Sequence, residues 1–216
     1  MSNEPFSRIG GFAGFAFVGG VMLQNGVLLQ GAPLPGATLE AVQAFYVDRR
    51  GPVSLAVGWV AINVPLLLVF GAAVGQRLQR EARSSLFGWV GVGGVVLLAA
   101  AFLGTTWIQA VLTARAPDLA AAGTLGLVWD FHTAAFSTSG LALSVALGAF
   151  SVGGWRSEAV PKWTAAVGIV GTICLVISGL LAVGSVGGGP GIFFQLAGFV
   201  AWVVFLLAAS VRLLKA

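Results

Sequence analysis

The sequence contains very little charge. Only 8% of its 216 residues are Asp, Glu, Lys or Arg, whereas 58% are hydrophobic and the mean hydropathy is +0.98. Soluble domains are typically about 25% charged and about 45–50% apolar, so this composition excludes an ordinary soluble domain and indicates a membrane protein. The 11 basic residues are scattered over short polar segments. They form no continuous basic patch, which excludes a nucleic-acid-binding surface.

Residues that carry redox and metal chemistry are equally scarce. Cys174 is the only cysteine and His132 the only histidine, which excludes a disulfide framework, a cysteine-based zinc or iron–sulfur site and a bis-histidine haem. Lys162 and Lys215 lie at the edges of apolar runs, so no lysine is placed for a retinal Schiff base. Ser139 shares one predicted helix with His132 and cannot reach it. We therefore expect a non-catalytic protein without a metal or cofactor.

Six long apolar runs are present, and each is long enough to cross a hydrocarbon core of about 30 Å as a helix. They cover residues 9–29, 53–74, 86–112, 125–150, 164–183 and 192–213. The alternation with a period of two that a membrane barrel needs is missing. The sequence predicts an all-α polytopic membrane protein in which residues 1–216 form one integral membrane bundle. Its predicted connections are residues 31–37, 76–85, 113–118, 153–162 and 184–191.

Basic residues are distributed unequally between the two sides of this predicted bundle. One side carries eight of them: Arg8, Arg77, Arg80, Arg83, Arg156, Lys162, Arg212 and Lys215. The other side carries Arg49, Arg50 and Arg115. The positive-inside rule therefore predicts a multi-pass protein of the cell membrane with both termini in the cytoplasm. Aromatic belts are predicted from Trp107 and Trp129 on the outer side and from Trp89, Trp155 and Trp163 on the inner side.

The segment between the first two runs has the pattern of a short amphipathic helix. Thr38 is a suitable N-cap, and four apolar residues follow at helical spacing, namely Leu39, Val42, Phe45 and Tyr46. This pattern predicts an interfacial helix on the outer face. We expect it to stop at Gly51-Pro52, with Gly51 in a left-handed cap.

Small residues recur at four-residue spacing in two of the predicted spans. Gly10 and Gly14 form one pair, and Gly140, Ser144 and Gly148 form a longer stripe. Since lipid is as apolar as leucine, helices in a membrane associate through close backbone approach at such positions. Both sets are predicted helix contacts.

Two ionisable residues, Asp130 and His132, fall within a predicted span. Two positions along a helix separate them by about 200°, so each needs its own partner. Asp130 is a candidate for an ion pair with Arg49 or Arg50, or it is a carboxylate stabilised by the helix amino terminus. His132 is either part of a polar site or a hydrogen-bonded interfacial histidine. Asp130, His132, Gln24 and Asn25 are the candidate lining of a polar cavity that opens outward.

Three segments carry a family resemblance: YVDRRGP from Tyr46, EAVPKW from Glu158 and LLAASVRLLKA from Leu206. On these segments the chain resembles a broad family of uncharacterised multi-spanning membrane proteins widespread in high-GC bacteria. The resemblance implies the same topology and no particular activity. Nine arginines to two lysines agree with a high-GC source.

The sequence leaves three functions open. The first is an accessory or scaffold subunit that packs against other membrane proteins or itself through its small-residue faces. The second is a small transporter or channel with the polar outward cavity. The third is a lipid- or quinone-binding protein, which needs an apolar cleft. The lipid bilayer is the expected partner in all three.

Overall fold

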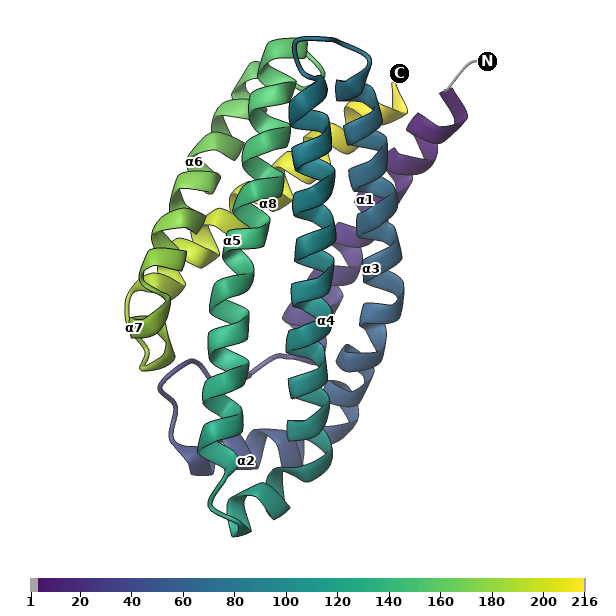
Figure 1. Ribbon diagram of the computed structural model, residues 1–216. Helices are drawn as coiled ribbons and strands as arrows, with labels where there is room; N and C mark the ends of the chain where they lie inside the picture. The colour runs from purple at the N-terminus through teal and green to yellow at the C-terminus, as the bar shows by residue number, and fades with distance from the viewer. Residues whose placement is uncertain (1–3, 216) are drawn as a thin grey trace.

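The computed structural model describes residues 4–215, and within them the regular structure is entirely helical (Figure 1). The described part contains eight α-helices and one π-helical turn. These are α1 (Glu4–Leu23), η1 (Gln24–Leu28), α2 (Leu39–Asp48), α3 (Arg50–Gln79), α4 (Ser85–Ala121), α5 (Leu125–Ser157), α6 (Lys162–Leu180), α7 (Ala182–Val186) and α8 (Gly191–Leu214).

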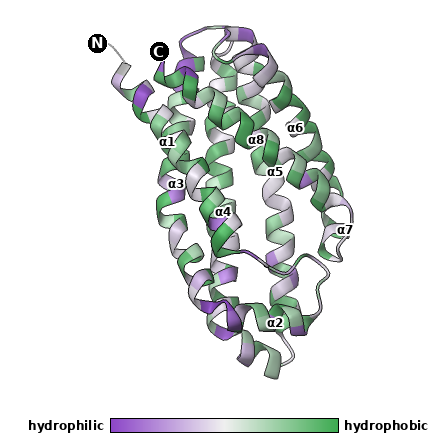
Figure 2. Cartoon of the chain, turned by 180° about the vertical axis from the view of Figure 1, so that it is seen from behind, coloured by the Kyte–Doolittle hydropathy of each residue, from purple (hydrophilic) through white to green (hydrophobic). Residues whose placement is uncertain are grey.

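Six segments within residues 4–215 are long and apolar enough to cross a membrane. They are α1 with η1, α3, α4, α5, α6 and α8, which confirms the predicted all-α polytopic fold. Hydrophilic residues gather mainly at the two ends of the bundle (Figure 2). The first and last helices meet at one end, where the Ser7 hydroxyl donates a hydrogen bond of 2.9 Å to the Leu213 carbonyl. We call this the terminal end and the opposite one the α2 end (Figure 1).

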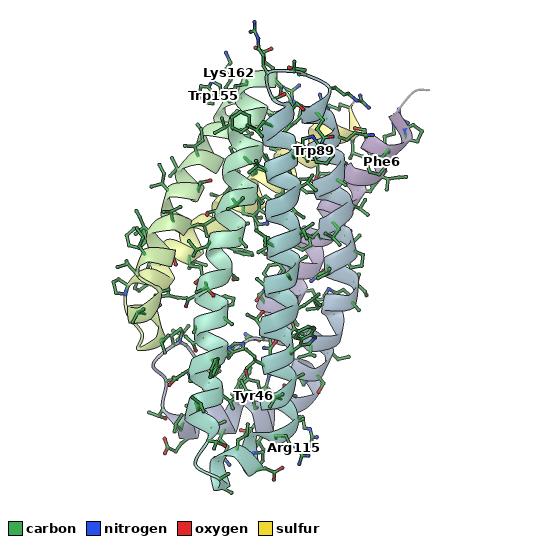
Figure 3. The ribbon with its side chains drawn as sticks, viewed as in Figure 1. Phe6, Tyr46, Trp89, Arg115, Trp155 and Lys162 are labelled. Carbon is green, nitrogen blue, oxygen red and sulfur yellow. The ribbon has the colours of Figure 1, made fainter. Side chains whose placement is uncertain are left out.

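Exposed tryptophans mark the level of the membrane along α4. Trp89 is 65% exposed and Trp107 is 69% exposed. They are separated by about 27 Å along the helix, close to the thickness of a hydrocarbon core. Phe6 and Trp155 lie near Trp89 at the terminal end, whereas Tyr46 lies at the other end (Figure 3). Beyond Trp107, α4 continues for about 20 Å. The α2 end therefore extends well past the level of Trp107.

This projecting end has a small hydrophobic core of its own. The α2 residues Val42, Phe45 and Tyr46 are buried against the ends of α3, α4 and α5. As predicted, α2 begins after Thr38, whose hydroxyl accepts a hydrogen bond of 3.3 Å from the Ala41 amide. The helix thus lies across the mouth of the bundle as a floor (Figure 1).

The predicted connection at residues 113–118 is wrong, because α4 runs through it to Ala121 with Pro117 inside the helix. An ion pair of 3.0 Å between Arg115 and Asp118 spans one turn there. The helix ends instead at Ala121, and the turn after it is made by Gly123, which has a φ of +69°. The Thr124 amide donates to the Leu119 carbonyl and the Gly123 amide to the Ala120 carbonyl, which is a Schellman end.

Two smaller predictions at the α2 end are also wrong. Gly51 does not cap α2 in a left-handed conformation, because α2 ends at Asp48 and Gly51 already belongs to the first turn of α3. Trp129 is not an exposed belt residue. It is 5% exposed and belongs to the small core under α2.

Glycines lie where the long helices approach one another most closely. A Cβ added at Gly94 on α4 would lie 2.5 Å from the backbone nitrogen of Ala146 on α5. Of the predicted contact residues, Gly10 faces Ala73, Gly14 faces Phe70 and Ser210, and Gly148 faces Thr172. Ser144 is buried and bonds to its own helix at the Leu141 carbonyl, and Gly140 lies beside Leu175 at ordinary contact distance. The small-residue faces are therefore used within this chain.

Gly94→Ala should destabilise the bundle by about 1–3 kcal/mol, because the added methyl meets backbone atoms that cannot rotate away. Thermal unfolding in detergent and in lipid would measure the effect. Gly93→Ala is the matched control, since no described atom lies within 4 Å of its added Cβ. Equal melting temperatures for the two variants would contradict the assignment of Gly94 to a backbone contact.

Candidate functional site

Buried neutral polar side chains form a layer between the middle of the bundle and the α2 end. The close contacts Gly71–Val95 and Gly94–Ala146 fix how the antiparallel helices α3, α4 and α5 align. Three buried polar residues lie on the α2 side of these contacts. Along its own helix each residue is about 12–17 Å from the contact, so the three lie at one level. They are Asn63 on α3, Thr105 on α4 and Ser137 on α5. We call these residues, with Gln195 and Ser178 described next, the polar layer.

Helices α8 and α6 add two more residues to the layer. Gln195 on α8 donates a hydrogen bond of 2.9 Å from Nε2 to the Phe136 carbonyl, so its side chain lies against α5 next to Ser137. Ser178 on α6 is fully buried, and the adjacent Gly179 faces Leu141 on α5. Buried polar side chains of five helices thus lie at a similar depth in the bundle.

Near α1 the layer continues into a small hydrogen-bonded group. Asn63 donates from Nδ2 to Oε1 of Gln24 at 3.0 Å, and Gln24 donates from Nε2 to the Ala56 carbonyl at 3.1 Å. Gln24 is the first residue of η1, and π-helical turns occur frequently at functional sites. A Cβ at Gly20 would collide with Oδ1 of Asn63 and lie 2.9 Å from Nε1 of Trp59. The absence of a side chain at Gly20 therefore leaves room for both groups.

Several polar atoms in the half of the bundle nearer α2 have no hydrogen-bond partner among the described residues. They are Nε1 of Trp59, Oδ1 of Asn63, Oγ1 of Thr133, Oε1 of Gln195 and the Oγ atoms of Ser137 and Ser178. Burial of an unpaired polar group costs about 1–3 kcal/mol. Most hydroxyls in the spans avoid this cost by bonding to their own helix, as Thr138 does with the Ala134 carbonyl. The layer is therefore suited to water or a polar molecule as the missing partner.

On the terminal side of the layer three buried aromatic rings pack together. The rings of Phe70 and Trp202 meet edge to face with centroids 6.3 Å apart, and Phe205 stacks on Trp202 at 6.1 Å. All three side chains are less than 2% exposed. We call these three residues the aromatic plug. It lies between the polar layer and the terminal end, within the main hydrophobic core.

The residues predicted from the sequence are only partly brought together. Gln24 joins the polar layer, but Asn25 is exposed and bonds back to the Val21 carbonyl of its own helix. Asp130 is exposed near the level of Trp107 and forms no ion pair within the described residues. The predicted pair with Arg49 or Arg50 is therefore not present.

The two other members of the predicted set have different partners. Arg49 donates from its Nη2 to the Val27 carbonyl at 3.3 Å, which ties α3 to the chain after α1. His132 stacks on Trp129 at 5.3 Å between ring centroids, outside the polar layer. Asp130 and His132 lie about one turn or more on the α2 side of Ser137 along α5, so they are outside the polar layer.

Sequence reasoning missed Asn63, Gln195 and Gln109, which are the amides buried within α3, α8 and α4. A signal for them exists, since amide side chains inside apolar runs usually bond across helices. Asn63 stands in NVPLLL and Gln195 in FFQLAG, each surrounded by apolar residues. These amides are uncharged, so they stand out less in an apolar run than the ionisable Asp130 and His132 do.

Gln109 lies beneath the layer, next to the only tyrosine of the chain. Tyr46 is 2% exposed in the floor formed by α2. Burial raises the pKa of Tyr46 above its ordinary value of 10.0, and the hydrogen bond with the Gln109 side chain lowers this pKa by less. Helix α2 thus places the neutral phenol of Tyr46 between the polar layer and the solvent at the α2 end.

Known protein families, curated proteins and solved structures contain no match to this chain. The family resemblance seen in the sequence therefore stays a prediction. Within residues 4–215 no three His, Cys, Asp or Glu side chains are grouped closely enough to hold a metal ion. The candidate site is therefore defined by neutral hydrogen-bonding groups.

Because the Tyr46 pKa is raised in the folded state, the unfolded chain loses its phenolic proton first as the pH rises. The folded state then holds more protons, so stability should fall as the pH rises above about 10. Tyrosinate absorbance in the folded protein should appear well above the pH at which it appears in denaturant. Tyr46→Phe is the control, since it should abolish the absorbance and flatten the alkaline loss of stability. Folded and denatured titration curves that coincide would contradict the burial of this phenol.

Proposed function

We propose that this protein carries a small uncharged polar solute across the membrane through the polar layer. The observation that supports the proposal is the set of unpaired donors and acceptors buried at one depth on several helices. Asn63 and Gln195 offer carbonyl oxygens, Trp59 offers an indole N–H, and Ser137 and Ser178 offer hydroxyls. A solute with both donors and acceptors complements this mixture.

The neutrality of the layer favours an uncharged solute over an ion. An ion at this depth would need a counter-charge or a complete shell of ligands to offset its desolvation. The nearest ionisable candidates, Asp130 and His132, lie outside the layer. Small amides, polyols and water need only the hydrogen bonds that the layer provides.

The aromatic plug favours a carrier over an open pore. A solute that enters from the α2 end meets Phe70, Trp202 and Phe205, which fill the bundle beyond the layer. Passage then requires these rings to move, so we expect slow, saturable flux. By the positive-inside rule the plug lies toward the cytoplasm and the layer toward the outer side, with both termini cytoplasmic.

A scaffold role receives less support than transport. The small-residue faces that suggested it lie against other helices of the same chain, as Gly14 lies against Phe70 and Gly148 against Thr172. Both hypotheses, transport and scaffold, describe a non-catalytic membrane protein.

Flux into proteoliposomes would test the proposal, with urea, glycerol and acetamide as probes and light scattering as the readout. Asn63→Leu should lower the saturable flux about 2- to 10-fold, because each lost hydrogen bond contributes about 0.5–1.5 kcal/mol. Gln195→Leu should act in the same direction. Thermal unfolding of each variant would show whether the bundle remains folded.

Asn25→Leu is the matched control, because Asn25 is exposed and its amide bonds only to its own helix. Its flux should equal that of the original protein. Flux equal to that of empty liposomes for all three probes would contradict transport. An equal loss in the Asn25 and Asn63 variants would contradict the role of the layer.

A further inference from the structure

Three arginines converge at the terminal end, where α3 and α8 both finish. Arg77 in the last turn of α3 donates from Nη1 to the backbone carbonyl of Arg212 at 3.1 Å. Arg212 lies in the last turn of α8, and Arg80 is the C-cap residue of α3. Arg80 follows Arg77 at a spacing of three residues, so the two side chains are neighbours at the end of α3. We call Arg77, Arg80 and Arg212 the arginine cluster.

The arginine cluster lacks a neutralising partner in the described part of the chain. The one ion pair found between residues 5 and 215 is Arg115–Asp118, at the opposite end. Glu81, which follows Arg80 in the sequence, forms no ion pair with these arginines among the described residues. Like charges held together in this way are stabilised by an anion that binds between them.

The level of the arginine cluster in the membrane indicates the kind of anion. Gln79 lies beside Gly88, one residue from the exposed Trp89 that marks the hydrocarbon boundary. Arg80 follows directly after Gln79, so the cluster lies at the height of lipid headgroups. Guanidinium groups bind phosphate through paired N–H donors.

We propose that the arginine cluster binds the phosphate of an anionic phospholipid in the leaflet at the terminal end. The lipid phosphate bridges the ends of α3 and α8, and its acyl chains lie along the apolar surface of the bundle. This binding would hold the two helices together beside the aromatic plug, since Phe70 belongs to α3 and Trp202 to α8. The inference rests on charge and position at the terminal end and does not depend on the proposed transport.

Native mass spectrometry of the delipidated protein in neutral detergent would test this site, with phosphatidylglycerol and phosphatidylcholine as probes. We expect tighter binding of phosphatidylglycerol and a higher melting temperature in its presence. Arg80→Gln and Arg212→Gln should each weaken the apparent affinity about fivefold. Both side chains are exposed or partly exposed, so these variants should fold, whereas Arg77 also bonds to the backbone and is left unchanged.

Lys162→Gln is the matched control, because it removes one exposed charge at the same end on the far side of the bundle (Figure 3). Its affinity for phosphatidylglycerol should stay unchanged. Equal binding of the two lipids, or an equal loss in the Lys162 variant, would overturn the proposal. Inorganic phosphate is the last probe, and the same rise in melting temperature with phosphate alone would overturn the lipid assignment in favour of a soluble anion.

Discussion

Close approach of helix backbones is the constraint on which the rest of this bundle depends. Lipid does not drive apolar surfaces together, so the helices are held by the contacts they make at short distance. At Gly94 the backbone of α4 comes near enough to that of α5 that even one methyl group has no space. Gly71 against Val95 and Gly171 against Ala201 extend the same kind of contact to α3, α6 and α8. These contacts fix the alignment of the helices along the bundle.

The alignment brings the polar residues to a common depth. Asn63, Thr105 and Ser137 are far apart in the sequence, and each belongs to a different helix. Together with Gln195 they interrupt the apolar interior at one level, where unpaired polar atoms reduce the stability of the bundle. A protein that only needed to fold would gain by replacing them with apolar residues. Their presence therefore favours a bound polar molecule.

The spans could be predicted from the sequence because a run of twenty or more apolar residues is long enough to cross a membrane and is rare in soluble domains. Helix α2 was also predictable, since Thr38 and the spacing of Val42, Phe45 and Tyr46 are local signals. The end of α4 escaped prediction because Pro117 is tolerated near the end of a long helix, so the stop occurs at Gly123 instead. Of the polar layer and its neighbours, only Gln24 was predicted from the sequence. The members of the layer are neutral and separated in the sequence, and only the helix contacts show which of them share a depth.

The interior of the bundle combines buried polar side chains with one tightly packed aromatic group. Asn63, Ser137 and Gln195 lie toward α2, whereas Phe70, Trp202 and Phe205 pack together nearer the termini, where Ser151, Thr164 and Ser210 are also buried. The same α3 and α8 that carry this plug end at the arginine cluster, where Arg77 bonds to the carbonyl of Arg212. A phosphate bound between these helix ends would oppose their separation. Since the rings of the plug can part only if α3 and α8 move or their side chains rotate, the closed half would be most stable where anionic lipid is abundant.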